Sequence, residues 1–336
     1  MAPPARTILV MARTIPLQPG APAPSSSASS ASIWAALAVI YVVWGTTYLA
    51  IRVTNQTLPP LLAASLRFLI AGAILYAWSV RRGDRVGDRP GLQQWRAAAI
   101  VGVLLLFGGN GGVVWAERTI PSGIAALLIA LVPLWIAMID GVVLRHRVRP
   151  LTATGIVIGF GGAALLLLGG GGTGRVEPLG MLLVVAASLS WASGALYSRT
   201  APLPRRPLVG AGMEMLAGGI ALGIAGVLAG ELADVRPERF SLASVASLAY
   251  LIVFGSFVAF TCFVWLLRIA RTSLVATYAY VNPVVAVFLG WLILGEQVTL
   301  RTVVAGLVIV AAVALIISAG GTRRGDEQPV GIGRTR

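Results

Sequence analysis

The chain has 336 residues, of which 57% are hydrophobic and only 11% are charged. Soluble domains carry about 25% charged residues, so this composition predicts a polytopic membrane protein and excludes an ordinary soluble enzyme. The formal net charge of +14 would suggest nucleic-acid binding in a soluble protein. In a membrane protein the arginines report topology instead, and no nucleic-acid partner is expected.

Reactive side chains are scarce. Cys262 is the single cysteine and His146 the single histidine, which excludes an intramolecular disulfide and a multi-thiolate metal site. An intramembrane enzyme would need clustered His, Cys, Ser or paired carboxylates, and the sequence has no such cluster. We therefore expect no catalytic residue, metal or cofactor.

Residues 1–32 are rich in Pro, Ala and Ser and are predicted to be a disordered cytoplasmic tail. The apolar run from Ile8 to Ala12 is shorter than the roughly 7–15 residues of a signal-peptide core, so a signal peptide is not expected. Met1 and Met11 both remain candidate start residues.

The rest of the chain predicts an all-α membrane protein. Apolar stretches near the length of about 20 residues that a spanning helix needs occur ten times, with short connections between them. The predicted spans are 33–51, 61–80, 96–115, 120–139, 151–169, 178–197, 208–229, 243–266, 272–293 and 300–319.

The arginines give the predicted orientation. With the N-terminus inside, the cytoplasmic segments hold nineteen arginines and the outer loops hold six, and Arg67 lies within a span. Basic residues favour the cytoplasmic side. Both termini, including the tail 320–336, are therefore predicted to be cytoplasmic.

The two halves of the chain resemble each other. A shift of 147 residues places Trp44–Arg52 on Trp191–Arg199 and Arg67 on Glu214, and a shift of 150 places Pro133 on Pro283. This predicts two five-helix repeats, 33–169 and 178–319, joined by a flexible linker at 170–177. Five spans is an odd number, so the second repeat would be inverted, as in many secondary transporters. The alternative is a duplication inherited by a protein that does not transport.

Several motifs carry a resemblance to a known family. The chain resembles the EamA-domain drug/metabolite transporter superfamily, particularly its YedA-like exporter branch. The matching segments are YVVWGTTYLAIR (41–52), LRFLIAG (66–72), AERTIPSGIAAL (116–127), LVPL (131–134), SLSW (188–191), MEMLAGG (213–219) and YAYVNPVVAVFLG (278–290).

The resemblance implies two five-helix EamA repeats around a central cavity, a multi-pass location in the bacterial inner membrane, and export of small metabolites or drugs. Without a nucleotide motif, the energy would come from an ion or substrate gradient, and proton coupling is one candidate. A flippase for a lipid-linked or lipid-carrier substrate is the alternative, and a homodimer stays open. One departure is that Arg145-His146 stands in the first repeat where the second has Gly295-Glu296.

Arg67 and Glu214 are the clearest ionisable residues inside spans, where charge is costly and marks function by default. Arg67 lies near the outer end of its span and Glu214 near the inner end of its own. We expect one charge in each vestibule, with Glu214 as the candidate proton carrier. The alternatives are a snorkelling arginine and local capping.

Polar and proline residues inside apolar spans mark the predicted substrate path. Asn110 and Asn282 are predicted to contact substrate or to hydrogen-bond backbone freed by neighbouring Gly and Pro. Pro133 and Pro283 are predicted to interrupt matching helices and to act as midplane hinges.

Aromatic residues supply flat surface for apolar or cationic ligands. The predicted cavity residues are Trp44, Tyr48, Trp191, Tyr278 and Tyr280; the alternative for some is a place in the interfacial aromatic belt.

Glu117 lies at the end of the third span. We expect a structural role for it, either capping the start of the fourth span or pairing with Arg118.

Overall fold

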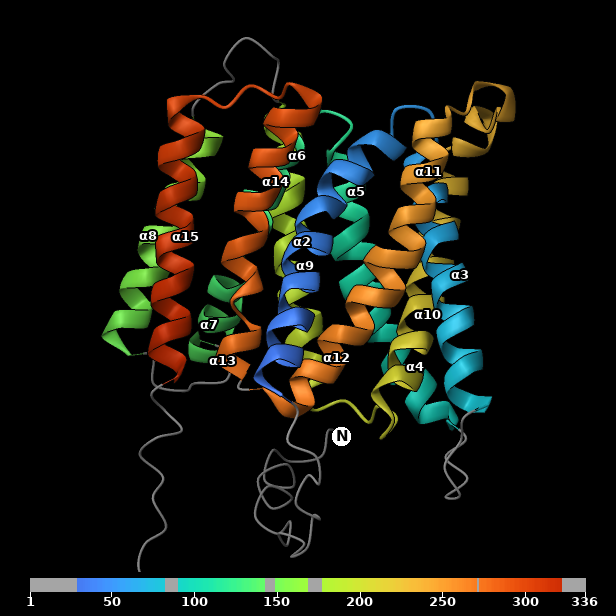
Figure 1. The fold of residues 1–336 in the computed structure, drawn as a ribbon, viewed down its shortest axis with the longest axis horizontal. Helices are drawn as coiled ribbons and strands as arrows, with labels where there is room; N and C mark the ends of the chain where they lie inside the picture. The colour runs from blue at the N-terminus through green and yellow to red at the C-terminus, as the bar shows by residue number, and fades with distance from the viewer. Residues whose placement is uncertain (1–28, 82–89, 143–148, 169–176, 271, 322–336) are drawn as a thin grey trace, which may run out of the picture.

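The structure is a computed structural model that describes residues 29–81, 90–142, 149–168, 177–270 and 272–321. Within these ranges the chain forms helices and turns and contains no strand, which confirms the all-helical prediction for that part of the chain. The helices run between an upper and a lower end of one bundle, as viewed in Figure 1. The predicted N-terminal tail up to residue 28, the linker from 170 to 176 and the C-terminal tail from 322 lie outside the described residues.

In the described residues, nine helices are long and apolar enough to cross a bilayer, and one further apolar helix is shorter. Each overlaps a predicted span. The elements of the first half are α2 (Ser30–Thr54), α3 (Pro60–Arg81), α4 (Leu92–Gly102), η1 (Val103–Gly111), α5 (Gly112–Ala116), α6 (Ser122–Ile129), α7 (Val132–Val142) and α8 (Pro150–Leu167). Those of the second half are α9 (Pro178–Ser198), α10 (Pro207–Leu228), η2 (Glu231–Asp234), η3 (Pro237–Arg239), α11 (Leu242–Tyr250), η4 (Leu251–Val258), α12 (Ala259–Ile269), α13 (Thr272–Val275), α14 (Tyr278–Leu294) and α15 (Leu300–Gly321).

The first helix begins earlier than predicted. The hydroxyl of Ser29 accepts a hydrogen bond from the backbone nitrogen of Ser32 at 3.2 Å and caps α2. A serine at this position satisfies one of the free donors of a helix start. Residues 30–32 therefore belong to the helix and not to the tail.

Two crossings are interrupted, and only the first break lies beside its proline. The first breaks between Ile129 and Val132, so that Pro133 is the second residue of α7, where its missing donor removes no helical hydrogen bond. The second breaks after Val275, and α14 then runs through Pro283 without interruption. The prediction that Pro283 interrupts its helix is wrong. A proline removes one backbone donor, and the rest of a packed helix keeps its hydrogen bonds.

Glycines bring α3 and α10 into close antiparallel contact. A Cβ on Gly212 would lie 2.8 Å from the backbone nitrogen of Tyr76, and one on Gly219 would lie 3.0 Å from Leu69. Small residues let helices in a membrane approach backbone to backbone. These two helices occupy one edge of the bundle in Figure 1.

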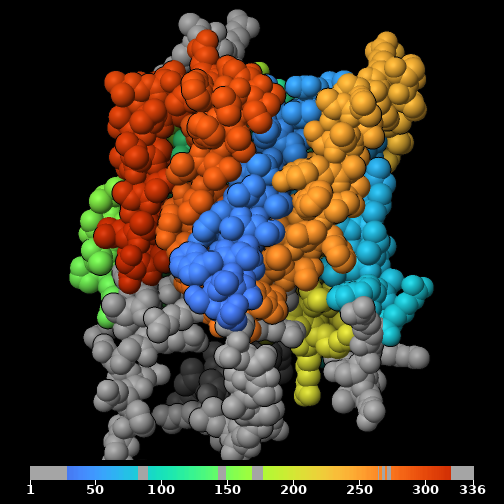
Figure 2. Space-filling model, in the orientation of Figure 1, coloured from blue at the N-terminus to red at the C-terminus, as the bar shows by residue number. Residues whose placement is uncertain are grey.

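The opposite edge is built in the same way from α8 and α15. A Cβ on Gly155 would lie 2.7 Å from Ile316, and one on Gly162 would lie 2.9 Å from Ile309, so this pair is antiparallel too. Between the two edges, Figure 2 shows α2 on the surface between α14 and the helix formed by α11, η4 and α12. Each of these contacts joins the first half of the chain to the second.

Candidate functional site

Two crossings contain a wide π-helical turn in their middle. These are η1 (Val103–Gly111), between α4 and α5, and η4 (Leu251–Val258), between α11 and α12. π-helices are rare and are often found at functional sites. The two segments start 148 positions apart in the sequence, close to the spacing that relates the two halves. They could not be predicted from the sequence, because an apolar π-helical run has the same residue pattern as an apolar α-helical one.

A tryptophan from α2 packs on η4. The indole Nε1 of Trp44 donates to the carbonyl oxygen of Gly255 at 3.2 Å. The Trp44 ring lies 5.1 Å from both Phe263 and Tyr278, and the Tyr278 ring meets it edge-on. The structure therefore places the predicted residues Trp44 and Tyr278 in one aromatic cluster. Phe263 completes this cluster and was not predicted.

A tryptophan from α9 packs on η1 in the corresponding way. A Cβ on Gly109 would lie 2.8 Å from Cε3 of Trp191. The neighbouring hydroxyl of Ser190 donates to the carbonyl oxygen of Leu104, also in η1, at 2.8 Å. Trp191 stands 147 positions after Trp44. Each half of the chain thus places a tryptophan against the π-helix of the other half.

Asn110 and Asn282 both carry a side-chain oxygen that is buried and accepts no hydrogen bond within the described structure. Asn110 lies in η1 and Asn282 lies in α14, one residue before Pro283. A buried polar atom without a partner costs free energy. Neither oxygen uses its capacity to accept a hydrogen bond within the described structure.

Tyr48 and Tyr280 are half-buried and pack against the same hydrophobic cluster, which includes Ile120, Leu127 and Leu131. This cluster is distinct from the one around Trp44, whose core includes Leu37, Ile40 and Leu266. Tyr48 remains within electrostatic range of Tyr278. The structure thus brings Tyr48 near Tyr278, while Trp191 packs on another cluster.

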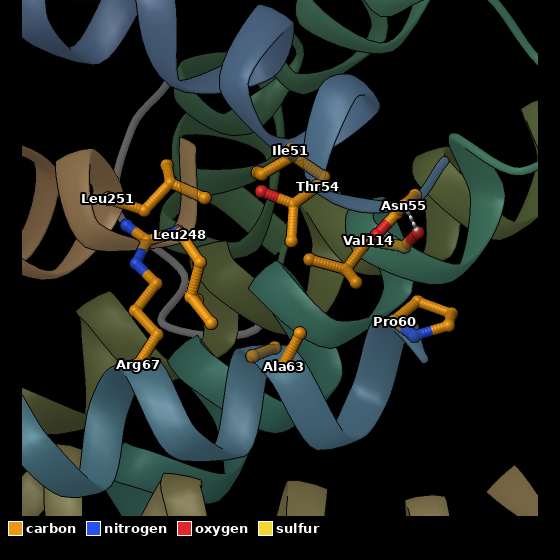
Figure 3. Close-up of a pocket in the computed structure, with 10 residues that line it drawn as sticks. Ile51, Thr54, Asn55, Pro60, Ala63, Arg67, Val114, Leu248 and Leu251 are labelled. Carbon is orange, nitrogen blue, oxygen red and sulfur yellow. Dashed lines mark hydrogen bonds between the residues drawn. The ribbon is translucent and has the colours of Figure 1, made fainter. Parts of the chain in front are cut away.

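Arg67 points from α3 toward Leu248 and Leu251, beside a small pocket (Figure 3). Its Nε donates to the hydroxyl of Ser256 in η4 at 2.8 Å, and only 5% of the residue is exposed. A snorkelling arginine keeps its charged group in water. This guanidinium instead contacts the π-helix, which does not match the snorkelling alternative.

Glu214 is half-buried in α10 and does not reach Arg67. The antiparallel packing sets Gly219 against Leu69 and Gly223 against Ser65. Arg67 is therefore level with the turn between those two glycines. Glu214 lies about 10 Å further along α10, at about 1.5 Å per residue. The two charges occupy different levels of the bundle, as the sequence predicts.

Two carboxylates cap helices at the upper end of the bundle. Glu231 accepts from the backbone nitrogens of Leu61 and Leu62 at 3.1 and 2.9 Å, at the start of α3. Glu296 accepts from those of Ser122 and Gly123 at 2.8 and 3.1 Å, at the start of α6. Carboxylates stabilise helix N-termini. Sequence reasoning could not find these pairs, because their members lie far apart in the chain.

Glu117 does not have the role expected from the sequence. The start of α6 is occupied by Glu296. Arg118 instead places its guanidinium 4.5 Å from the ring of Trp115. Both oxygens of the Glu117 carboxyl are buried and without a hydrogen-bond partner. Neither predicted contact of Glu117 is present.

Comparison with known proteins gives the family. The EamA-like transporter family matches the chain twice, over residues 29–168 and 178–318. The "Uncharacterized inner membrane transporter YedA" of Escherichia coli (strain K12) is 40% identical over 285 residues, which cover 84% of this chain and 90% of that protein. "Protein PecM" of Dickeya dadantii (strain 3937) is 28% identical over 286 residues, with 82% and 88% covered.

A solved crystal structure also matches, with a TM-score of 0.59 and 22% identity over 88% of this chain and 100% of that one, which shows a shared fold. Together with the apolar helices, the relatives identify a multi-pass transporter of the inner membrane. The resemblance seen in the sequence motifs is confirmed. The chain belongs to the EamA-like transporter family and is YedA-like.

Proposed function

We propose that the chain is a secondary active transporter that exports small metabolites or drugs by alternating access between two inverted five-helix repeats. The tenth crossing is made by α13 and α14. The observation that carries the proposal is the pair of matched contacts in which Trp44 meets the π-helix η4 and Trp191 meets the π-helix η1. The antiparallel packing of α3 on α10 and of α8 on α15 further supports an inverted relation between the halves.

The substrate path runs between the two repeats, along the side chains that both halves offer. The aromatic faces bind apolar or cationic groups, and the free oxygens of Asn110 and Asn282 accept from a donor on the ligand. A small organic molecule with an apolar body and an amine or amide donor fits this chemistry. The proposed contacts are Trp44, Tyr48, Asn110, Trp191, Tyr278, Tyr280 and Asn282.

The π-helices give each repeat a place to change shape. A π-helical turn that relaxes to α-helix changes the direction of the helix beyond it. Trp44 on Gly255 and Trp191 on Gly109 would then transmit that change to the other half. Pro133, next to a broken turn, and Pro283, inside α14, are the accompanying hinges.

The energy source is an ion or substrate gradient. Both termini lie in the cytoplasm, and the upper end of the bundle faces the outside. Arg67 and Glu214 stand in opposite vestibules, and Glu214 is a proton carrier in this scheme. Glu214→Gln would remove pH-driven flux, because the variant has no carboxyl group to carry a proton. The amount of inserted protein should stay unchanged. Unaltered coupling in this variant would eliminate the proton role of Glu214.

The experiment is transport into proteoliposomes of a panel of amino acids and cationic drugs, with and without a pH gradient. Trp44→Ala and Trp191→Ala should each abolish flux. Trp291→Ala is the matched control, because Trp291 lies on the exposed face of α14 with 54% of its surface free. If a correctly folded sample moves none of the compounds but translocates a lipid-linked sugar, the flippase alternative replaces the exporter.

A further inference from the structure

The connection between α5 and α6 contains a buried carboxyl group, Glu117, without a contact that would stabilise a negative charge. Glu117 directly follows the membrane-spanning helix that ends at Ala116, and none of its surface is exposed. Both of its carboxyl oxygens lack a hydrogen-bond partner in the described structure. A buried carboxylate needs an opposite charge or several donors, and Glu117 has neither in contact.

The cation that acts on this carboxyl is engaged elsewhere. The guanidinium of Arg52, on α2, donates to the backbone carbonyl of Glu117 and not to its carboxyl group. This contact ties α2 to the end of α5. It leaves Arg52 close enough to act on the carboxyl electrostatically without forming an ion pair with it.

The anion that acts on this carboxyl already accepts from the backbone donors of α6. Glu296 uses both oxygens on the backbone nitrogens of Ser122 and Gly123 at the start of α6. The Ser122 hydroxyl beside it is buried and unpartnered. Two carboxyl groups at one site do not readily ionise together. Two backbone donors at the start of α6 compensate Glu296, whereas no donor reaches the carboxyl oxygens of Glu117.

The other ionisable groups at this site do not change that conclusion. Tyr48, on α2, lies within electrostatic range of the carboxyl. Arg118 lies over Trp115, and Glu177 is exposed at the start of α9. Burial raises the pKa of Glu117 well above its ordinary value, the charge of Glu296 raises it further, and Arg52 opposes both effects.

We propose that Glu117 is a proton-binding site, which is protonated while α2, α5 and α6 are packed at the upper end of the bundle. When Glu117 releases its proton, the guanidinium of Arg52 moves from the backbone carbonyl of Glu117 to its carboxylate. The proton passes to water as this end opens, and the new ion pair replaces the contact that joined α2 to α5. This inference rests on the proposed function, because it names the proton as the coupling ion. Glu117 would be a second proton-binding carboxyl besides Glu214, at the opposite end of the bundle.

Infrared difference spectroscopy tests the site without a substrate. The spectrum of the wild-type protein at neutral pH minus that of Glu117→Gln should contain the C=O band of a protonated carboxyl. The corresponding difference for Glu231→Gln, a side chain bonded to a helix start, should lack the band of a protonated carboxyl. A carboxylate signal in the Glu117 difference spectrum would overturn the proposal.

A second variant covers the case in which Glu117→Gln does not fold. In a Glu214→Gln background, which removes the other proposed proton carrier, the carboxyl band should disappear as the pH rises, and adding Glu296→Gln should move that loss to lower pH by removing the neighbouring negative charge. An unmoved titration in Glu296→Gln would count against the proposal. The results distinguish the two hypotheses. A protonated Glu117 in a protein that transports nothing would contradict the exporter function alone. Flux driven by a pH gradient without the carboxyl band would contradict the proton site at Glu117 alone.

Discussion

The indole of Trp44 donates to the carbonyl of Gly255 at 3.2 Å, so that α2 of the first half is hydrogen-bonded to the middle of the π-helix in the second half. A π-helix pairs its backbone groups five residues apart instead of four, and the Trp44 indole adds a donor from outside the helix to one of its carbonyl groups. The contact therefore links the shape of η4 to the position of α2.

Removing this bond should destabilise the fold while leaving an aromatic ring in place. Trp44→Phe takes away the donor and leaves the Gly255 carbonyl buried. The cost should be about 1–3 kcal/mol in free energy of unfolding, measured by titration with a denaturing detergent in mixed micelles. Trp265→Phe, on a ring with 37% exposure, is the control and should cost much less. Equal losses in both variants would show that the Trp44 bond contributes nothing specific.

The contact between α3 and α10 should not tolerate a methyl group. Gly212→Ala would set its Cβ 2.8 Å from the backbone nitrogen of Tyr76, and such overpacking costs about 1–3 kcal/mol. Gly161→Ala is the matched control in α8, because a Cβ there meets nothing within 4 Å. The Gly161 variant should be neutral or slightly more stable, since alanine favours helix. Thermal unfolding of both variants in the same detergent distinguishes them, and a stable Gly212→Ala would contradict the packing described above.

Glu231 should matter more than its neighbours in the same loop. Glu231→Ala removes both acceptors from the start of α3, and charge-assisted hydrogen bonds of this kind contribute about 1.5–3 kcal/mol. Glu238→Ala, at an exposed position in η3, is the control. Hydrogen exchange at Leu61 and Leu62 should accelerate in the first variant only. Unchanged protection there would show that the cap does not hold the helix.

The buried carboxyl of Glu117 should make the stability of the protein fall as the pH rises. Below its ordinary pKa of 4.5 the carboxyl is protonated in both folded and unfolded chains, and its contribution is constant. Above that value only the unfolded chain releases the proton, because burial raises the pKa of the folded state. Stability should therefore fall by up to about 1.4 kcal/mol per pH unit until the folded pKa is reached.

The measurement compares the unfolding free energy of the wild-type protein with that of Glu117→Gln over the range from pH 5 upward. The difference between the two should change in favour of the variant as the pH rises. A difference that does not depend on pH would show that Glu117 titrates normally.

Much of the fold could be predicted from the sequence, because the signal of a spanning helix is local. The apolar run at 61–80 and the helix Pro60–Arg81 differ by one residue at each end. The breaks were harder to place: Pro283 is the obvious breaker in the sequence, but the turn lies at residues 276–277. Proline limits only its own hydrogen bond, whereas the path of a helix depends on everything packed around it.

The site divides in the same way. Trp44 and Tyr278 could be singled out as aromatic residues in repeat-matched or motif-bearing spans, and the structure brings them together. The hydrogen bond that Arg67 donates to Ser256 and the one that the Leu61 backbone donates to Glu231 join residues 189 and 170 positions apart. No spacing rule indicates such pairs in one sequence. They depend on how the two halves pack.

The central claim, that the two halves move against each other, is tested most directly by spin-label distances in proteoliposomes. With Cys262→Ser as background, one pair of labels would replace Arg118 and Glu238 at the upper end, and another would replace Arg81 and Thr200 at the lower end; all four positions are exposed. On addition of a transported compound, the two distances should change in opposite directions. Distances that change together, or that stay fixed while the compound is transported, would contradict alternating access between the repeats.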